Sequence, residues 1–201
     1  MRTLFLHGLA GHGSEWDALQ ARIPAEAPDL RVYGTRDEYV ADVVELIGGG
    51  PVCLIGQSLG GHTAMLVAAR HPELVERAVI VEASPEQDAA ARDGVRAFFE
   101  ANPSHYGDPI DPAQAAACLD EIAERDFWDD WRRISCPVLV VRADSGGHSA
   151  DVVEHMVREN PNAQSVAIAG AGHDVHLDHP AALAEAIERW AQPSTPSTSE
   201  T

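Results

Sequence analysis

Short apolar runs alternate with longer amphipathic stretches along the chain. The runs are rich in leucine, isoleucine and valine and are bounded by glycine, proline or charged residues, which is typical of buried β-strands. The predicted strands are Leu4–Leu6, Leu30–Tyr33, Val52–Ile55, Ala78–Val81, Val138–Val141 and Ser165–Ile168. Several stretches between them repeat their apolar residues at helical spacing. The predicted helices are Ser14–Ile23, Asp37–Ile47, Leu59–His71, Ala150–Asn160 and Pro180–Ala191.

This alternation predicts an α/β fold with a mainly parallel central sheet and helices on both faces, because parallel strands need crossover connections that cover the sheet. Two helix starts are marked in the sequence. Ser14 and Asp17 have capping-box spacing, and Pro180 opens the last helix. The chain of 201 residues fits one domain, which we place at residues 1–192. The remainder, 193–201, is rich in Pro, Ser and Thr and is expected to be disordered.

Residues 84–134 interrupt the alternation with two alanine-rich helical stretches and a connection at 102–112. This segment predicts a small helical cap over the carboxyl ends of the strands, where open α/β sheets bind ligands. Its aromatic side chains are expected either to line an apolar pocket or to hold the cap onto the sheet. They are Phe98, Phe99, Tyr106, Phe127, Trp128 and Trp131. Trp16 is expected to border the same pocket.

The charge balance argues against some classes of partner. The formal net charge is -18 and the sequence pI is about 4.7, so phosphate backbones and anionic lipids are repelled. We expect neither nucleic acid nor a membrane as a partner, and the oligomeric state stays open. The apolar run at the N-terminus is too short for a signal peptide, so the expected location is the cytoplasm. Cys53, Cys118 and Cys136 are expected to be reduced core residues.

The strongest chemical signal is Gly56-Gln57-Ser58-Leu59-Gly60, where a predicted strand runs through Gly-x-Ser-x-Gly into a predicted helix. In this context the serine occupies a sharp turn, and the glycines avoid collisions with the neighbouring strand and helix. Ser58 is therefore the predicted nucleophile. The alternative is a glycine-rich turn with an incidental serine. We interpret His62, one helical turn later, as a structural residue.

A serine hydroxyl becomes a useful nucleophile only when a base takes its proton. His173 follows the last predicted strand in Gly170-Ala171-Gly172-His173 and is the predicted base. His176 and His179 follow at three-residue intervals, so the alternatives are that one of them is the base or that the three histidines bind zinc. Because this spacing on a loop is weak evidence without a further ligand, we expect no metal.

Two further parts of such a site have candidates. The oxyanion hole needs two backbone N–H groups, which we assign to Leu59 and to Leu9 in the loop 7–13. That loop lacks the third glycine of a nucleotide-binding fingerprint, so phosphate binding is set aside. A carboxylate must orient the histidine, and Asp144 and Glu82 each follow a predicted strand closely enough to do so.

Through these motifs the chain resembles the α/β-hydrolase superfamily of lipases, esterases and dehalogenases. The resemblance spans almost the whole chain and rests on Leu6-His7-Gly8, the segment 56–61, the segment 137–142 and Gly170–His173. It implies the fold, a Ser-His-acid triad, no cofactor, and acyl or related carbon-centred chemistry. Dehalogenation is not implied, because that reaction needs a carboxylate nucleophile and this motif supplies serine.

The resemblance also bears on the acid. Most members place it in a Gly-x-x-Asp pattern after the penultimate strand, whereas this chain reads Ala143-Asp144-Ser145-Gly146, with Gly146 where the acid is expected. Some relatives, including certain haloalkane dehalogenases, place the acid at the end of the preceding strand, in a context similar to Val81-Glu82-Ala83. On that similarity we favour Glu82 over Asp144.

These features together predict a serine hydrolase that cleaves a small or medium apolar carboxylic ester or thioester through an acyl-enzyme. Two alternatives stay open. The same triad also suits C–C cleavage, lactone opening or elimination in a biosynthetic pathway. A fold of this kind also serves as a non-catalytic ligand-binding scaffold.

Overall fold

A five-stranded sheet forms the centre of the computed structural model, which describes residues 1–87 and 89–192. The strands lie in the order β1-β2-β3-β4-β5, and every neighbouring pair is parallel. Their bounds are β1 (Arg2–Leu6), β2 (Val52–Gln57), β3 (Val75–Val81), β4 (Val138–Ala143) and β5 (Ala163–Ile168). The predicted α/β fold with a parallel sheet is confirmed.

The helices follow the strands in the predicted alternation. Two short 3-10 helices are η1 (Gly13–Trp16) and η2 (Pro72–Leu74). The first α-helices are α1 (Asp17–Gln20), α2 (Arg36–Ile47), α3 (Leu59–Arg70) and α4 (Ala89–Ala101). The remaining ones are α5 (Pro112–Ala117), α6 (Asp120–Glu124), α7 (Trp128–Arg133), α8 (Ala150–Glu159), α9 (Val175–Asp178) and α10 (Pro180–Ala191). None of these described helices combines the length and the hydropathy needed to cross a bilayer.

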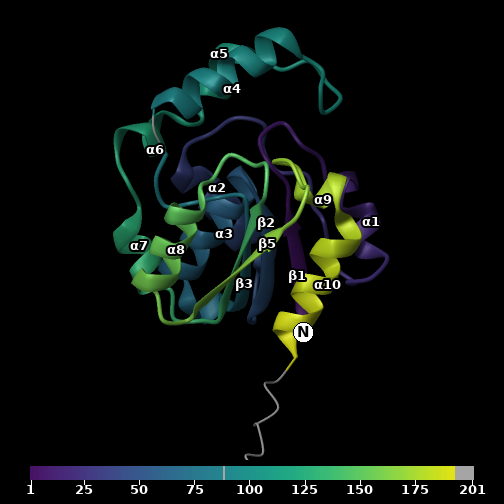
Figure 1. Cartoon of the computed structure of the whole chain (residues 1–201), viewed down its shortest axis with the longest axis vertical. Helices are drawn as coiled ribbons and strands as arrows, with labels where there is room; N and C mark the ends of the chain where they lie inside the picture. Colours follow the sequence, from purple (N-terminus) through teal and green to yellow (C-terminus); the bar gives the residue numbers. More distant parts are fainter. Residues whose placement is uncertain (88, 193–201) are drawn as a thin grey trace, which may run out of the picture.

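The order of the strands determines which helices cover which face. Because parallel neighbours follow each other in the chain, right-handed connections bring α2, α3, α7 and α8 to one face. The other face is covered by α1, α9 and α10 (Figure 1). Successive strand residues point to opposite faces of the sheet, and each face has its own hydrophobic core cluster. Leu54 packs in one cluster and Ile55 in the other. The strands β2 and β4 are thus buried on both faces along most of their length, which explains their nearly continuous apolar runs.

The predicted strand Leu30–Tyr33 is wrong. Its backbone and side chains bond elsewhere: the N–H of Leu30 donates to Nε2 of His7 at 2.8 Å, and the hydroxyl of Tyr33 accepts from the N–H of Asp111 in the cap segment. The chain instead meets the outer edge of β1 earlier, at Glu26, through an isolated bridge to Leu4. This run therefore connects the loop after β1 to the cap segment through hydrogen bonds.

The predicted helix Ser14–Ile23 is shorter than expected and starts differently. Its ordered turns are η1 and α1, so the α-helix ends at Gln20. The proposed Ser14–Asp17 cap is wrong, because the residue before the first turn is His12 and its N–H donates to the carboxylate of Glu15 at 3.2 Å. The predicted start of the last helix at Pro180 is confirmed.

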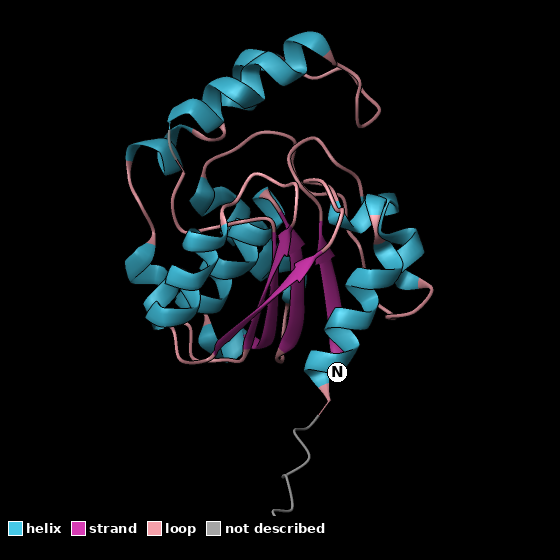
Figure 2. Cartoon of the chain, viewed as in Figure 1, coloured by secondary structure: helices cyan, strands magenta, loops and turns pink. Residues whose placement is uncertain are grey.

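The predicted cap segment divides into two parts. Helices α4 and α5 lie over the carboxyl ends of the strands, at the end to which the arrowheads point (Figure 2). They share a small apolar cluster built on Phe99, Ile110 and Ala115. Helix α7 instead packs against α3 and α8 on the face of the sheet. Only the first part of residues 84–134 therefore covers the sheet end; the predicted tail, 193–201, lies outside the described residues.

Candidate active site

Ser58 occupies the turn between β2 and α3, with φ 52° and ψ -118°. This left-handed conformation is strained for a side-chain-bearing residue and typical of a functional position. The glycines beside it allow the close approach of helix and strand: a Cβ on Gly56 would overlap the carbonyl group of Gly60, and a Cβ on Gly60 would overlap that of Leu6. The N–H of Ser58 donates to the carbonyl of Val81 at 2.8 Å and fixes the turn to β3.

Glu82 is the carboxylate that meets His173. Its Oε2 lies 3.3 Å from Nδ1 of His173, and its side chain is fully buried. Two backbone groups hold the carboxylate: the N–H of Ala143 donates to Oε1 at 2.6 Å, and the N–H of Gly147 donates to Oε2 at 2.9 Å. Because Nδ1 faces Glu82, Nε2 is the ring nitrogen left for proton transfer.

Glu82 is favoured in its charged form although burial opposes charge. Burial raises the pKa of its carboxyl group, but the bonds from His173 and from the N–H groups of Ala143 and Gly147, together with the nearby His148, lower the pKa by more. Burial also lowers the pKa of His148, which lines the same cavity.

Asp144, the other candidate acid, pairs with Arg142 and not with His173. Its side chain is 58% exposed and lies 3.7 Å from the guanidinium of Arg142. Its backbone N–H pairs with the carbonyl of Ile168, which places the residue at the end of the sheet. The geometry brings Glu82, not Asp144, to His173.

The loop after β1 carries the predicted oxyanion donor. The buried imidazole of His7 organises this loop: its Nε2 accepts from the N–H of Leu30, so its Nδ1 is the nitrogen that donates to the carbonyl of Gly8 at 2.7 Å. Leu9 and Leu59 both line the cavity beside Ser58. The N–H of Leu59 belongs to the first turn of α3, where backbone donors have no partner within the helix.

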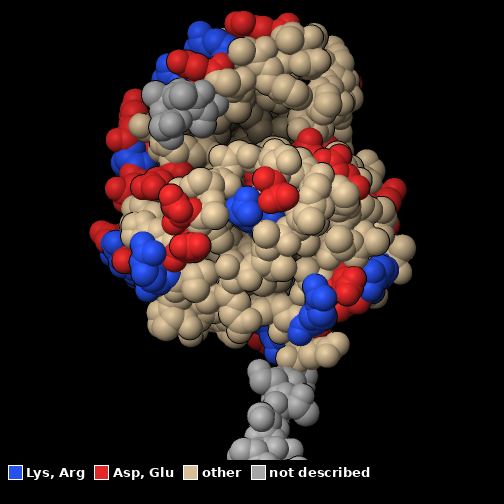
Figure 3. Space-filling model, in the orientation of Figure 1, with Lys and Arg blue, Asp and Glu red and all other residues tan. Residues whose placement is uncertain are grey.

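A cavity of about 520 Å³ lies between the cap helices and the sheet end. Figure 3 shows the hollow between the upper segment and the body of the molecule. Ser58 and His173 both line it. Its apolar wall includes Leu9, Leu59, Val95, Phe98, Phe99 and Leu119. Its other polar side chains are Glu15, Gln57, Gln87, His105, Tyr106, His148 and Asp174.

Four of the seven aromatic residues considered for the pocket, namely Trp16, Phe127, Trp128 and Trp131, do not line it. Trp16 is fully buried and stacks on Phe5, with ring centroids 4.8 Å apart. Phe127, Trp128 and Trp131 belong to the core cluster between the sheet and α3, because α7 folds onto the body and not over the site. The rings that do line the cavity, Phe98, Phe99 and Tyr106, come from α4 and the connection that follows it.

The remaining histidines have separate environments. Nε2 of His176 lies 3.1 Å from Oε2 of Glu15, and His62 packs edge-on against Phe127 with ring centroids 4.8 Å apart. In the described part of the chain, His173, His176 and His179 do not form a group that could hold a metal ion. His62 is buried away from the cavity, in agreement with its structural interpretation.

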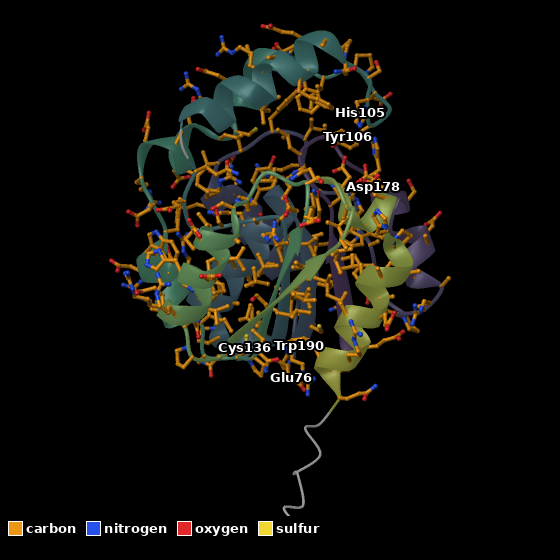
Figure 4. The ribbon with its side chains drawn as sticks, viewed as in Figure 1. Glu76, His105, Tyr106, Cys136, Asp178 and Trp190 are labelled. Atoms are coloured by element: carbon orange, nitrogen blue, oxygen red, sulfur yellow. The ribbon has the colours of Figure 1, made fainter. Side chains whose placement is uncertain are left out.

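Among the polar residues of the cavity that the sequence reasoning missed are Glu15, Tyr106 as a hydrogen-bond donor, His148 and Asp174. Tyr106 donates its hydroxyl to Oδ2 of Asp174 at 2.9 Å, and so connects the cap to the loop that carries His173. Figure 4 shows His105 and Tyr106 together on the cap connection. The adjacency of Asp174 to His173 is the one sequence signal that pointed to any of them.

Comparison with known proteins identifies relatives of the whole chain. The family model described as alpha/beta hydrolase family matches residues 3–186. The chain is 35% identical over 171 residues to lipase LipV of Mycobacterium tuberculosis, which covers 78% of this chain and 58% of the lipase. It thus spans less than two thirds of that relative's length. It is 24% identical over 240 residues to 2-(acetamidomethylene)succinate hydrolase of Mesorhizobium japonicum, covering 93% and 86% of the two chains.

Solved structures share the fold. The crystal structure of E-2-(acetamidomethylene)succinate hydrolase superposes with a TM-score of 0.79 at 23% sequence identity, covering 94% of this chain and 90% of the other. At this identity the likeness concerns the arrangement of strands and helices.

Proposed function

This chain belongs to the alpha/beta hydrolase family, and we propose that within it the chain is a serine hydrolase that cleaves a small or medium apolar carboxylic ester or thioester. The observation that carries the proposal is the arrangement of three residues. Ser58 stands on a strained strand-to-helix turn, His173 lines the same cavity, and the buried Glu82 carboxylate lies 3.3 Å from Nδ1 of that histidine. This arrangement supports the assignment of Ser58 as nucleophile, His173 as base and Glu82 as orienting acid.

The proposed reaction proceeds in two steps. Nε2 of His173 takes the proton of Ser58 as Oγ attacks the carbonyl carbon, and the N–H groups of Leu9 and Leu59 stabilise the resulting oxyanion. The imidazolium, stabilised by Glu82, gives its proton to the leaving alcohol or thiol as the C–O or C–S bond breaks. A water molecule then attacks the acyl-enzyme with His173 as base, which releases the carboxylic acid and restores the Ser58 hydroxyl.

The cavity supports an apolar acyl substrate. Its volume of about 520 Å³ falls within the range of small-molecule sites, and Val95, Phe98 and Phe99 form an apolar wall on the cap side. Burial of an acyl chain against this wall would contribute roughly 0.8 kcal/mol for each methylene group. Chain length is therefore expected to affect turnover until the cavity is filled.

Mass-shift labelling with a fluorophosphonate tests the proposal, alongside hydrolysis of p-nitrophenyl acetate and butyrate. We expect one label on the wild type, turnover of both esters, and loss of both properties in Ser58→Ala. Ser165→Ala, which changes an exposed serine on β5, is the matched control and should keep both. A folded wild type that takes no label and turns over no ester would contradict the acyl-enzyme mechanism and favour ligand binding or a non-acyl reaction.

A further inference from the structure

Two carboxylates line the candidate active-site cavity, with no lysine or arginine beside them among the described lining residues. Glu15 belongs to η1, directly after the loop that carries Leu9, and Asp174 directly follows His173, so both carboxylates lie close in sequence to the proposed catalytic groups. None of the described residues that line the cavity is a lysine or an arginine. The polar side of the cavity therefore carries negative charge.

The side chain of Glu15 is mostly buried and is held in place by hydrogen bonds. Its side chain is 12% exposed. Oε1 accepts from the N–H of His12 at 3.2 Å, and Oε2 lies 3.1 Å from Nε2 of the buried His176. The ring of His176 in turn packs on Trp16, with centroids 4.5 Å apart. The neighbouring Gly11 has no side chain, and a Cβ there would lie 2.7 Å from Oε2 of Glu15.

Asp174 is held from two sides of the cavity. Nε2 of Gln57 donates to its Oδ1 at 3.3 Å, and the hydroxyl of Tyr106 donates to its Oδ2 at 2.9 Å. Burial, followed by the charge of Asp174, raises the pKa of the Tyr106 hydroxyl, so this group remains a proton donor at neutral pH. Both bonds fix the carboxylate between the end of β2 and the cap.

From this charge distribution we infer that the cavity selects its substrate by charge: it accepts neutral and cationic acyl esters and rejects esters whose acyl chain carries a carboxylate. The inference rests on the proposed function. A carboxylate entering the cavity loses hydration and meets two fixed carboxylates, and no lysine or arginine among the described lining residues offsets that loss. An uncharged chain meets the apolar wall of Val95, Phe98 and Phe99 instead.

Matched p-nitrophenyl esters measure this selection. The neutral ester is the hexanoate, the anionic one is mono-p-nitrophenyl adipate, and the cationic one is the 6-(trimethylammonio)hexanoate. After subtraction of uncatalysed hydrolysis, we expect kcat/KM for hexanoate to exceed that for adipate at least tenfold, and the cationic ester to match or exceed hexanoate. The ratio should shrink as salt is raised, because salt screens the interaction.

Charge-removing variants locate the source of the selection. Asp174→Asn and Glu15→Gln keep the side-chain shapes, and each is expected to reduce the hexanoate-to-adipate ratio several-fold. The ratio within one variant is independent of any general loss of active protein. Glu76→Gln removes the same charge from an exposed site at the opposite end of the molecule (Figure 4) and should leave the ratio unchanged.

The outcomes separate the two proposals. If the wild type hydrolyses hexanoate and adipate with equal kcat/KM, charge selection is overturned and the serine-hydrolase function stands. The selection is also overturned if Asp174→Asn, Glu15→Gln and Glu76→Gln change the ratio equally. Absence of turnover for every ester, together with absence of fluorophosphonate labelling, would instead refute the proposed function.

Discussion

A Cβ built on Gly146 would overlap the carboxylate of Glu82. The loop after β4 and the end of β3 thus compete for one space, the space beside Nδ1 of His173. In this chain Glu82 fills it and Gly146 leaves it free. Glu82 can therefore occupy this position only because residue 146 has no side chain.

Removal of the charge on Glu82 should impair turnover far more than removal of the charge on Asp144. In Glu82→Gln the histidine loses the group that fixes its tautomer and stabilises its charged form, so kcat for p-nitrophenyl butyrate should fall by about 10²- to 10⁴-fold. Asp144→Asn should stay within about twofold of the wild type, because its exposed carboxylate does not contact His173. Equal losses in two folded variants would argue against Glu82 as the acid.

The competition between the two positions predicts a rescue. Glu82→Gly empties the space, and a second change, Gly146→Asp, places a carboxyl group in it. We expect the double variant to recover kcat at least tenfold over Glu82→Gly alone, since the requirement is a carboxylate near Nδ1 and not a particular strand. Gly147→Asp in the same background is the matched control and should give no recovery, because position 147 is open to solvent.

His62 should make the stability of the protein depend on pH. Burial, and then the guanidinium groups of Arg36, Arg70 and Arg125, hold the pKa of His62 well below its usual value. In the unfolded chain the imidazole of His62 is protonated below about pH 6.5, whereas in the folded chain it stays neutral. The contribution of His62 to the free energy of unfolding is therefore complete above that pH and is lost as the pH falls. From one such group, the free energy of unfolding should fall by about 1.4 kcal/mol between pH 7.5 and 5.5.

Urea unfolding at the two pH values isolates this contribution. The decrease should be smaller by this amount in His62→Leu than in the wild type. His71→Gln, at a half-exposed histidine just beyond the same helix, is the matched control for the loss of a histidine side chain. An identical pH dependence in the wild type and His62→Leu would show that His62 titrates in the folded state.

The Tyr106–Asp174 bond should hold the cap over the site. In Tyr106→Phe the loss of one partly buried hydrogen bond is expected to raise KM for p-nitrophenyl butyrate roughly two- to tenfold, with a smaller effect on kcat. Amide hydrogen exchange in residues 102–112 should become faster. Tyr39→Phe removes a similar bond, to the carbonyl of Val32, outside the cavity, and should change neither quantity. If amide hydrogen exchange in residues 102–112 is unchanged in Tyr106→Phe, the Tyr106–Asp174 bond does not hold the cap over the site.

Rings in the cavity and rings in the core should respond differently to truncation. Phe98→Ala is expected to change the preference for acyl chain length, since Phe98 lines the cavity and is 37% exposed. Trp131→Ala should lower the free energy of unfolding by about 3–5 kcal/mol, because this ring is fully buried and its N–H donates to the carbonyl of Met156. A stable Trp131→Ala protein with altered chain-length preference would reverse the two assignments.

The parts of the fold that are set by local pattern were predictable from the sequence. Val52–Ile55 and Val138–Val141 are buried on both faces, so their apolar runs are long enough to identify strands. The run Leu30–Tyr33 also carries aliphatic and aromatic residues, with Arg31 among them, but its backbone lies beyond the sheet, where His7 and the cap supply its partners. Composition alone does not distinguish these two environments.

The site was predictable where a motif fixes backbone geometry. Gly-x-Ser-x-Gly places Ser58 directly, and the loop after β5 brings His173 to the same end of the sheet. Part of the aromatic lining was predicted correctly, with Phe98, Phe99 and Tyr106, and part was misplaced because Phe127, Trp128 and Trp131 lie close to the cap helices in sequence but fold onto α3. Glu15 and Asp174 were missed because their role arises from long-range contacts with His176 and Tyr106.

The bridge between Leu4 and Glu26 affects how copies of this protein can assemble. The outer edge of β1 bonds to Glu26 through the N–H of Phe5 at 2.8 Å and the carbonyl of Thr3 at 3.0 Å. The guanidinium of Arg2 donates two hydrogen bonds to the carboxylate of the same glutamate, of 2.6 and 2.9 Å. Charge and an irregular neighbour at an edge discourage pairing with a strand from another molecule. Growth of the sheet across this edge, from one molecule into the next, is therefore disfavoured.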